Sequence, residues 1–335
     1  MWSNYQTSII VAVTLTILIS LFWFLQSLAL VVFVALLLAV LLTPAVDYLT
    51  ARKIPRLWSS LIILVLFISF VTWLFITLSG TFIPAFTRFI NDIPNMAESL
   101  KNLPFVQPNS LVGEQLDEMM KGITAFSLTA LKSSLGIIVS IFSKILNLVI
   151  ILFITFYLLK DGKIIKSYLA NLFPSRDKGR ISALFNNIIQ ALSAYIRGQL
   201  TICLITGVFV FAYFTIRDLP YAPVFAVLSA IGEFIPVVGP TLASLCGTVF
   251  AFTDTPITGS QTLIFYMLLT QINHNMIYPY LIGKSLNLHP VAIMIGILLG
   301  GETLGPIGMF LAVPCMVIIK LVIEDIARHR AKIVK

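Results

Sequence analysis

Several unbroken apolar runs of about twenty residues limit the fold of this chain more than any other feature. A run of that length can span the hydrocarbon core of a bilayer as a helix. Hydrophobic residues make up 59% of the 335 residues, only 11% are charged, and the mean hydropathy is +1.00. Soluble domains are typically about 25% charged. We therefore expect an all-α polytopic membrane protein with about eight transmembrane segments. A barrel would need alternating strands of about ten residues instead.

The order of the apolar runs predicts the organisation of the chain. We expect, in order, transmembrane segments 1–3 (residues 1–83), an external helical loop (84–133), segment 4 with a cytoplasmic loop and an amphipathic helix (134–198), a first and a second transport repeat (199–253 and 259–323) and a cytoplasmic tail (324–335). After "QPNS" the outer loop shows helical spacing, which predicts either a structured connector or an oligomer contact. The stretch 181–196 is amphipathic, and either lies on the membrane surface or continues as one long bent helix into the next segment.

The distribution of charge predicts the sidedness. The net charge is +8, and basic residues gather in the loops 50–57 and 160–197 and in the tail after 323. Basic loops face the cytoplasm. The loop 84–133 holds four basic and five acidic residues and is expected outside. We thus expect both termini in the cytoplasm, and the lipid bilayer, not nucleic acid, as the partner of the basic groups.

Two interrupted apolar stretches resemble each other and predict an internal repeat. Leu219–Pro240 and Leu286–Met309 each contain a Pro-Val pair, a half-helix of about 11 residues, a Gly-Glu pair, and a proline and glycine just beyond. Broken helices at corresponding places in two repeats indicate a transporter's binding site. The two stretches are either both broken spans, giving eight crossings, or both re-entrant hairpins, giving six.

Polar residues inside these apolar stretches are the candidate site. A charge at the bilayer centre costs roughly 2.5–3.5 kcal/mol on insertion scales. Glu233 and Glu302 are therefore either transport groups (proton carriers or cation ligands), or caps of broken helices or residues at an aqueous rim. In "QINHNMIYP", Gln271, His274, Asn275 and Tyr278 would share one α-helical face, which either lines a cavity or joins helices. The substrate- or ion-binding candidates are Glu233, Pro236, Gly239, Gln271, Asn273, His274, Asn275, Glu302 and Gly305, and the gate or anchor candidates are Arg197 and Gln199.

The sequence does not predict an enzyme. It contains no Walker A loop, no H-E-x-x-H motif and no G-x-G-x-x-G after a strand. Cys203, Cys246 and Cys315 lie far apart without metal-ligand spacing. We therefore expect no cofactor and no metal, and a secondary transporter rather than a pump driven by a nucleotide.

Five sequence blocks resemble the autoinducer-2 exporter family. They are "FYLLKDG" (156–162), "LFPSRDKGR" (172–180), "AYIRGQL" (194–200), "FIPVVGP" (234–240) and the stretch 278–314, and together they cover about the last 180 residues. The resemblance implies an inner-membrane protein of eight spans. Some members are associated with export of autoinducer-2 and others with sodium/proton antiport. The positions of Asn273 and Tyr278 often carry an acid in that pattern and are neutral here, which favours Glu233 and Glu302 as the functional acids.

Three functions follow from this pattern. The first is export of a small polar solute such as autoinducer-2. The second is antiport of a monovalent cation, Na⁺ or Li⁺, against protons. The third is a scaffold or channel-like homo-oligomer without transport, in which the glutamates would lie hydrogen-bonded in a dry interface.

Overall fold

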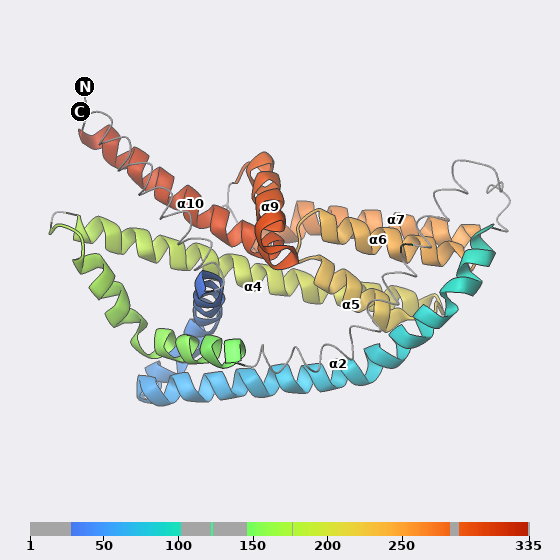
Figure 1. The fold of residues 1–335 in the computed structure, drawn as a ribbon, viewed down its shortest axis with the longest axis horizontal. Helices are drawn as coiled ribbons and strands as arrows, with labels where there is room; N and C mark the ends of the chain where they lie inside the picture. Colours follow the sequence, from blue (N-terminus) through green and yellow to red (C-terminus); the bar gives the residue numbers. More distant parts are fainter. Residues whose placement is uncertain (1–27, 102–121, 123–145, 176, 282–287, 334–335) are drawn as a thin grey trace, which may run out of the picture. The chain divides into compact units, whose positions relative to one another are not determined.

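The computed structural model describes residues 28–101, 122, 146–175, 177–281 and 288–333 (Figure 1). Within these ranges all regular elements are helical. The chain forms two compact units, Met1–Leu66 with Ile138–Ile165, and Phe67–Ile137 with Lys166–Lys335. The expected first segment and the expected helix after "QPNS" lie outside the described residues.

The first unit contains the helix Leu28–Ala51, the beginning of α2 (Arg56–Lys101) and most of the helix 146–171. Polar contacts join its helices. The Arg56 guanidinium donates through Nε to the carbonyl of Leu159 (2.8 Å) and through Nη1 to Asp47 Oδ1 (2.9 Å). The Thr155 hydroxyl, which is fully buried, lies 3.3 Å from the carbonyl of Ala35. These contacts fix one end of α2.

Helix α2 is longer than the sequence predicts. We expected the segment to end at 83, yet the helix continues to Lys101 with Pro84 and Pro94 inside it. Each proline removes one backbone hydrogen bond, but a long apolar helix tolerates this where its surroundings satisfy the freed carbonyl. The final part of α2 belongs to the second unit, where Phe89 packs edge-on against Phe225 with 5.5 Å between ring centroids.

The second unit is built on α4 (Lys178–Ile216), a single helix of 39 residues. This is the long-helix alternative for the stretch 181–196, and no proline interrupts it. Helix α5 (Ala222–Gly232) returns along α4, and Gly207 of α4 lets the side chain of Ala230 approach closely. The N-terminal half of α4 packs on α10 (Pro306–Ile333) through a buried cluster of Tyr195, Ile202, Val313 and Val317.

Two helical hairpins follow from the interrupted stretches. Helix α5 pairs with α6 (Val238–Phe252), and α9 (Pro290–Leu304) pairs with α10. In each hairpin two glycines bring the backbones together: a Cβ on Gly239 would lie 1.8 Å from the carbonyl oxygen of Gly232, and one on Gly308 would lie 1.9 Å from that of Gly300. No side chain fits at either crossing.

Both hairpins also turn through a residue with positive φ just before their second helix. Gly305 has φ +62° and Val237 has φ +68°. Glycine adopts this conformation easily, whereas a β-branched residue does so only under strain. The first hairpin therefore holds a strained turn, which its neighbours must stabilise.

Helix α7 (Pro256–Ile272) runs beside α6 and completes the core of this unit (Figure 1). Its N-terminus is well capped, because the Thr255 side chain accepts a hydrogen bond from the backbone of Thr258 (3.1 Å) and Pro256 occupies the first turn. After α7 come a π-helical turn, η1 (Asn273–Ile277), and the short helix α8 (Tyr278–Leu281). Stacked rings of Phe214 and Phe225, 4.8 Å apart, lie at the centre of the core.

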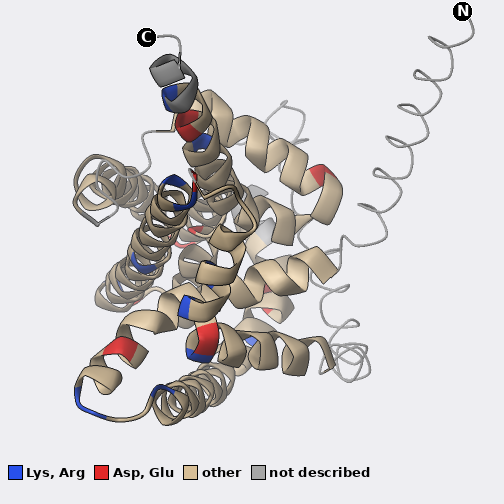
Figure 2. Ribbon diagram, turned by 90° about the vertical axis from the view of Figure 1, so that its left-hand side faces the viewer, with Lys and Arg blue, Asp and Glu red and all other residues tan. Residues whose placement is uncertain are grey.

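The described helices suit a bilayer. Four of them are long and apolar enough to cross it, Leu28–Ala51, Arg56–Met96, Lys178–Ile216 and Pro306–Arg328, while α5, α6 and α9 are shorter apolar helices. Charged residues are sparse along the described ribbon (Figure 2). This confirms an all-helical membrane protein; the count of eight segments and the internal repeat stay predictions.

The glycine crossing leads to a test of the fold. We expect Gly239→Ala to lower the free energy of unfolding of the purified protein by about 1–3 kcal/mol or more, because the added Cβ would overlap the Gly232 carbonyl. Gly80→Ala is the matched control: it lies within a helix with nothing within 4 Å of the added Cβ and should be neutral or slightly stabilising. Thermal unfolding in detergent measures both; equal stability of the two variants would refute the close crossing.

Candidate transport site

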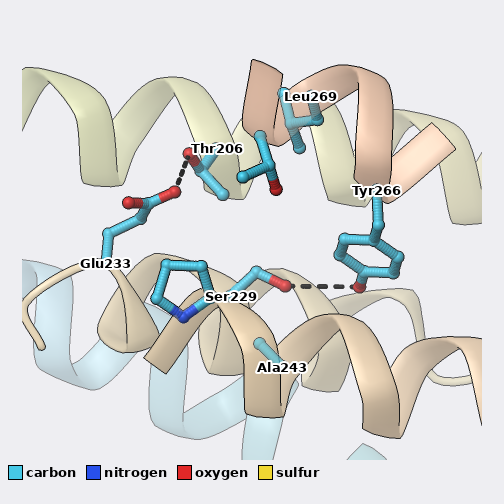
Figure 3. A pocket seen from close by; sticks show the side chains of 8 residues that line it. Thr206, Ser229, Glu233, Ala243, Tyr266 and Leu269 are labelled. Carbon is cyan, nitrogen blue, oxygen red and sulfur yellow. Dashed lines mark hydrogen bonds between the residues drawn. The ribbon is translucent and has the colours of Figure 1, made fainter. Parts of the chain in front are cut away.

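Glu233 lies at the break between α5 and α6 and is only 4% exposed. It follows Gly232, the last residue of α5, so its carboxylate reaches from the end of a half-helix toward α4 (Figure 3). An ionised carboxylate in an apolar surrounding needs hydrogen-bond donors or a cation. The residues that supply hydrogen bonds to this carboxylate therefore define the site.

Two neutral side chains donate to the same carboxylate oxygen. Thr206 Oγ1 on α4 lies 3.0 Å from Glu233 Oε1, and Asn273 Nδ2 on η1 lies 3.0 Å from it. Asn273 Nδ2 also donates to Thr206 Oγ1, at 2.9 Å. Thr206 is 4% exposed and Asn273 1%, so water does not compete freely with this triangle. Two separate elements, α4 and η1, thus converge on one acid.

Gln199 holds the broken backbone beside the same acid. Its Nε2 donates to the main-chain carbonyl of Glu233 at 2.7 Å. A break in a helix leaves carbonyls without their usual partners, and this side chain satisfies one of them. The other end of the amide, Oε1, is 3.4 Å from the Tyr278 hydroxyl on α8. Gln199 is therefore buried beside Glu233, and its role as a gate or anchor stays a prediction.

A small pocket adjoins the carboxylate (Figure 3). The space open to the centre of a water-sized particle is about 10 Å³, which is room for roughly one water molecule or dehydrated small ion. Polar groups lie at both ends, since Ser229 Oγ and the Tyr266 hydroxyl are 3.3 Å apart opposite Thr206 and Glu233. The residues that line it are Thr206, Ser229, Glu233, Pro240, Ala243, Tyr266, Leu269 and Thr270.

The polar residues of "QINHNMIYP" do not share one environment. Asn273 is buried and Tyr278 half-buried, whereas Gln271, His274 and Asn275 are exposed. Asn275 Nδ2 donates to Gln271 Oε1 (2.7 Å), and the His274 and Tyr278 rings stack with 5.3 Å between centroids, so the four residues predicted to share a face remain neighbours across the π-helical turn η1, while Asn273 is buried. Single π-turns inside helices frequently mark functional sites.

The remaining sequence candidates lie elsewhere. Glu302 is exposed near the end of α9, and Gly305 forms the turn after it. Gly239 is buried in the hairpin crossing and Pro236 is half-buried beside it. Arg197 is exposed, and its Nε donates to the carbonyl of Ser193 one turn earlier (3.1 Å), which fits an anchor. The structure therefore brings together Glu233, Asn273 and Gln199 from the predicted set.

Thr206, Ser229 and Tyr266 are site residues that the sequence analysis missed. Thr206 follows Gln199 by seven residues, two α-helical turns, and so shares its face of α4. That spacing could have indicated Thr206, but threonines are common in apolar helices and one of them does not by itself predict a site. Among the described residues, no group of three or more His, Cys, Asp or Glu side chains could hold a metal ion.

The apolar helices and the internal polar site are those of a multi-pass α-helical membrane protein of the transport class. The profile of the family described as "AI-2E family transporter" matches residues 11–328. The chain therefore belongs to the AI-2E family, which confirms the resemblance seen in the sequence.

Curated relatives cover most of this chain. "Putative transport protein YrrI" of Bacillus subtilis (strain 168) is 29% identical over 305 residues, which are 89% of this chain and 86% of that protein. "Putative permease PerM" of Escherichia coli (strain K12) is 24% identical over 307 residues, 87% of this chain and 85% of PerM. These names agree with a membrane transporter.

Gln199 provides a test of the site's construction. We expect Gln199→Leu to destabilise the protein by about 1–3 kcal/mol, because it leaves the buried Glu233 carbonyl without its donor. Gln271→Leu should change stability by less than about 0.5 kcal/mol, since Gln271 is exposed. Unfolding in detergent compares the two; a harmless Gln199→Leu would mean that the carbonyl does not depend on this side chain.

Proposed function

We propose that this protein is a secondary transporter in which Glu233 binds a proton or a monovalent cation in turn. One observation carries the proposal: a carboxylate 4% exposed lies at the break of a hairpin, held by neutral donors and beside a small cavity. A fixed cation beside it would neutralise the carboxylate permanently. The donors that reach it among the described residues, Thr206 and Asn273, leave its charge available for exchange.

The size and chemistry of the pocket favour a small ion. About 10 Å³ accommodates one dehydrated Na⁺ or Li⁺ or one water, not a solute of several heavy atoms. Hard cations prefer oxygen ligands. The carboxylate, the Thr206 hydroxyl and the hydroxyls of Ser229 and Tyr266 supply them. Because a proton and a cation would compete for one carboxylate, the site supports antiport of a monovalent cation against protons.

Movement of the hairpins would give the site access to each side in turn. The two hairpins meet where Phe234, next to Glu233, packs edge-on against Phe310 of α10 with 5.2 Å between ring centroids. Discontinuous helices at corresponding places in two repeats are a recurrent transporter element. We propose that the basic loops and both termini lie in the cytoplasm and that the protein resides in the inner membrane.

Export of a small polar solute is the second candidate, and the family description favours it. In that case proton exchange at Glu233 would drive the solute through a wider cavity in another conformation. Both candidates require Glu233 and place Glu302 outside the site, because Glu302 is exposed. A scaffold without transport would require neither.

Proton flux in proteoliposomes tests this proposal. With a pH-sensitive dye trapped inside, Na⁺ or Li⁺ added outside should change the internal pH in wild type. We expect Glu233→Gln to reduce this flux by about 100-fold or more, since no exchangeable charge remains. Glu302→Gln should stay within about twofold of wild type.

The outcomes separate the candidates. Cation-dependent flux that survives Glu233→Gln would refute the site. If folded wild type shows no flux, antiport fails, and a counterflow assay with labelled autoinducer-2 then tests solute export. No transport in either assay favours the scaffold.

A further inference from the structure

The two ends of the Asn273 amide differ in their hydrogen bonds. Its Nδ2 uses both hydrogens, one on Glu233 Oε1 (3.0 Å) and one on Thr206 Oγ1 (2.9 Å). Its Oδ1 is buried and has no hydrogen-bond partner in the part of the chain that the structure describes, although the residue is only 1% exposed. Buried amide oxygens nearly always have partners, so the arrangement calls for a second state in which this oxygen is used.

The orientation seen suits an empty, ionised carboxylate. Such a carboxylate only accepts hydrogen bonds. An amide turned the other way would place Oδ1 against Glu233 Oε1, acceptor against acceptor. Thr206 donates to the same oxygen, so both neighbours present a hydrogen to Glu233. The triangle is complete for the charged acid and leaves the Asn273 oxygen unpaired.

The opposite orientation suits an occupied site. A protonated Glu233 has a hydroxyl to donate, and Oδ1 would accept it. A monovalent cation on the carboxylate needs further oxygen ligands, and Oδ1 together with Thr206 Oγ1 would supply two beside the small cavity. A cation would repel the Nδ2 hydrogens, whereas a protonated Glu233 would donate its hydroxyl to Oδ1 and could still accept from Nδ2 at its carbonyl oxygen. In both cases occupancy brings Oδ1 to the site.

We propose that Asn273 is an ion-binding residue of the Glu233 site: its amide donates to the ionised carboxylate and turns its oxygen to the site when a proton or monovalent cation is bound. This rests on the function proposed above and assigns Asn273 a role in ion affinity. The π-helical turn that begins at Asn273 presents the amide to the acid.

Other titratable groups face Glu233 and define the background for any pH dependence. They are Cys203 on α4, His274 on η1 and Tyr278 on α8. His274 is exposed, and its Nδ1 lies 3.0 Å from the Thr270 carbonyl. None of the three supplies a permanent positive charge, so the neutral amide remains the adjustable partner of the carboxylate.

Binding of ²²Na⁺ to the purified full-length protein at alkaline pH tests the proposal. Asn273→Asp keeps an oxygen ligand but removes the donor of the empty state, and should tighten Na⁺ binding by about tenfold or more. Asn273→Leu removes the ligand and should weaken binding by about tenfold or more. Asn275→Asp is the matched control: it adds the same charge two residues away, on an exposed amide that donates to Gln271 (2.7 Å), and should stay within about twofold of wild type. Opposite shifts in the two Asn273 variants support the role. Shifts in one direction, or an Asn273→Asp that behaves like Asn275→Asp, overturn it.

Infrared difference spectra of the wild-type protein test the proposed turn of the Asn273 amide without a variant that could misfold. In protein with ¹³C-labelled asparagine amides, an asparagine carbonyl band should shift at the same pH as the protonated carboxyl band appears in sodium-free buffer. A carboxyl band that titrates while all asparagine bands stay fixed would overturn the proposal. If wild type binds no Na⁺ at all, cation antiport fails, and this titration still tests the response of Asn273 to the proton.

Discussion

The site depends on one physical constraint, the burial of a carboxylate inside an apolar protein. Glu233 can stay there only because Thr206 and Asn273 donate to it and because Gln199 satisfies its own main-chain carbonyl. These donors come from α4 and from the π-helical turn after α7. The arrangement of the helices around the break therefore depends on the charge of the Glu233 side chain. A change in that charge changes the strength of the surrounding hydrogen bonds.

The hairpins make this arrangement possible. Glycine pairs at Gly232–Gly239 and Gly300–Gly308 let two half-helices touch through their backbones, which places the end of α5 against α4 instead of letting the helix continue. The turn through Val237 stores strain in the first hairpin. An element held by a strained turn and a few hydrogen bonds is suited to two positions, and a transporter needs such an element.

Much of the architecture could be predicted from the sequence, and the limits have physical causes. The apolar runs predicted the helices, and "GEFIPVVGP" predicted the break and the buried Glu233. Glu302 occupies a similar sequence context but is exposed, because burial depends on what packs against the hairpin and not on the local pattern. Asn273 was one of several polar candidates in its stretch, and what distinguishes it is contact with Thr206 and Glu233, which depends on how η1 packs and not on local spacing. The length of α2 was missed because prolines usually end a helix, yet α2 continues through both Pro84 and Pro94.

The central claim is that the cavity beside Glu233 opens to each side of the membrane in turn. Ala243 lines that cavity, so Ala243→Cys in a chain with Cys203, Cys246 and Cys315 replaced places one thiol in it. A membrane-impermeant thiol reagent, applied to right-side-out and to inverted vesicles, reports access from each side. We expect labelling from both sides, with Na⁺ or acid pH shifting the balance between them. Labelling from neither side, or from one side under every condition, would contradict it.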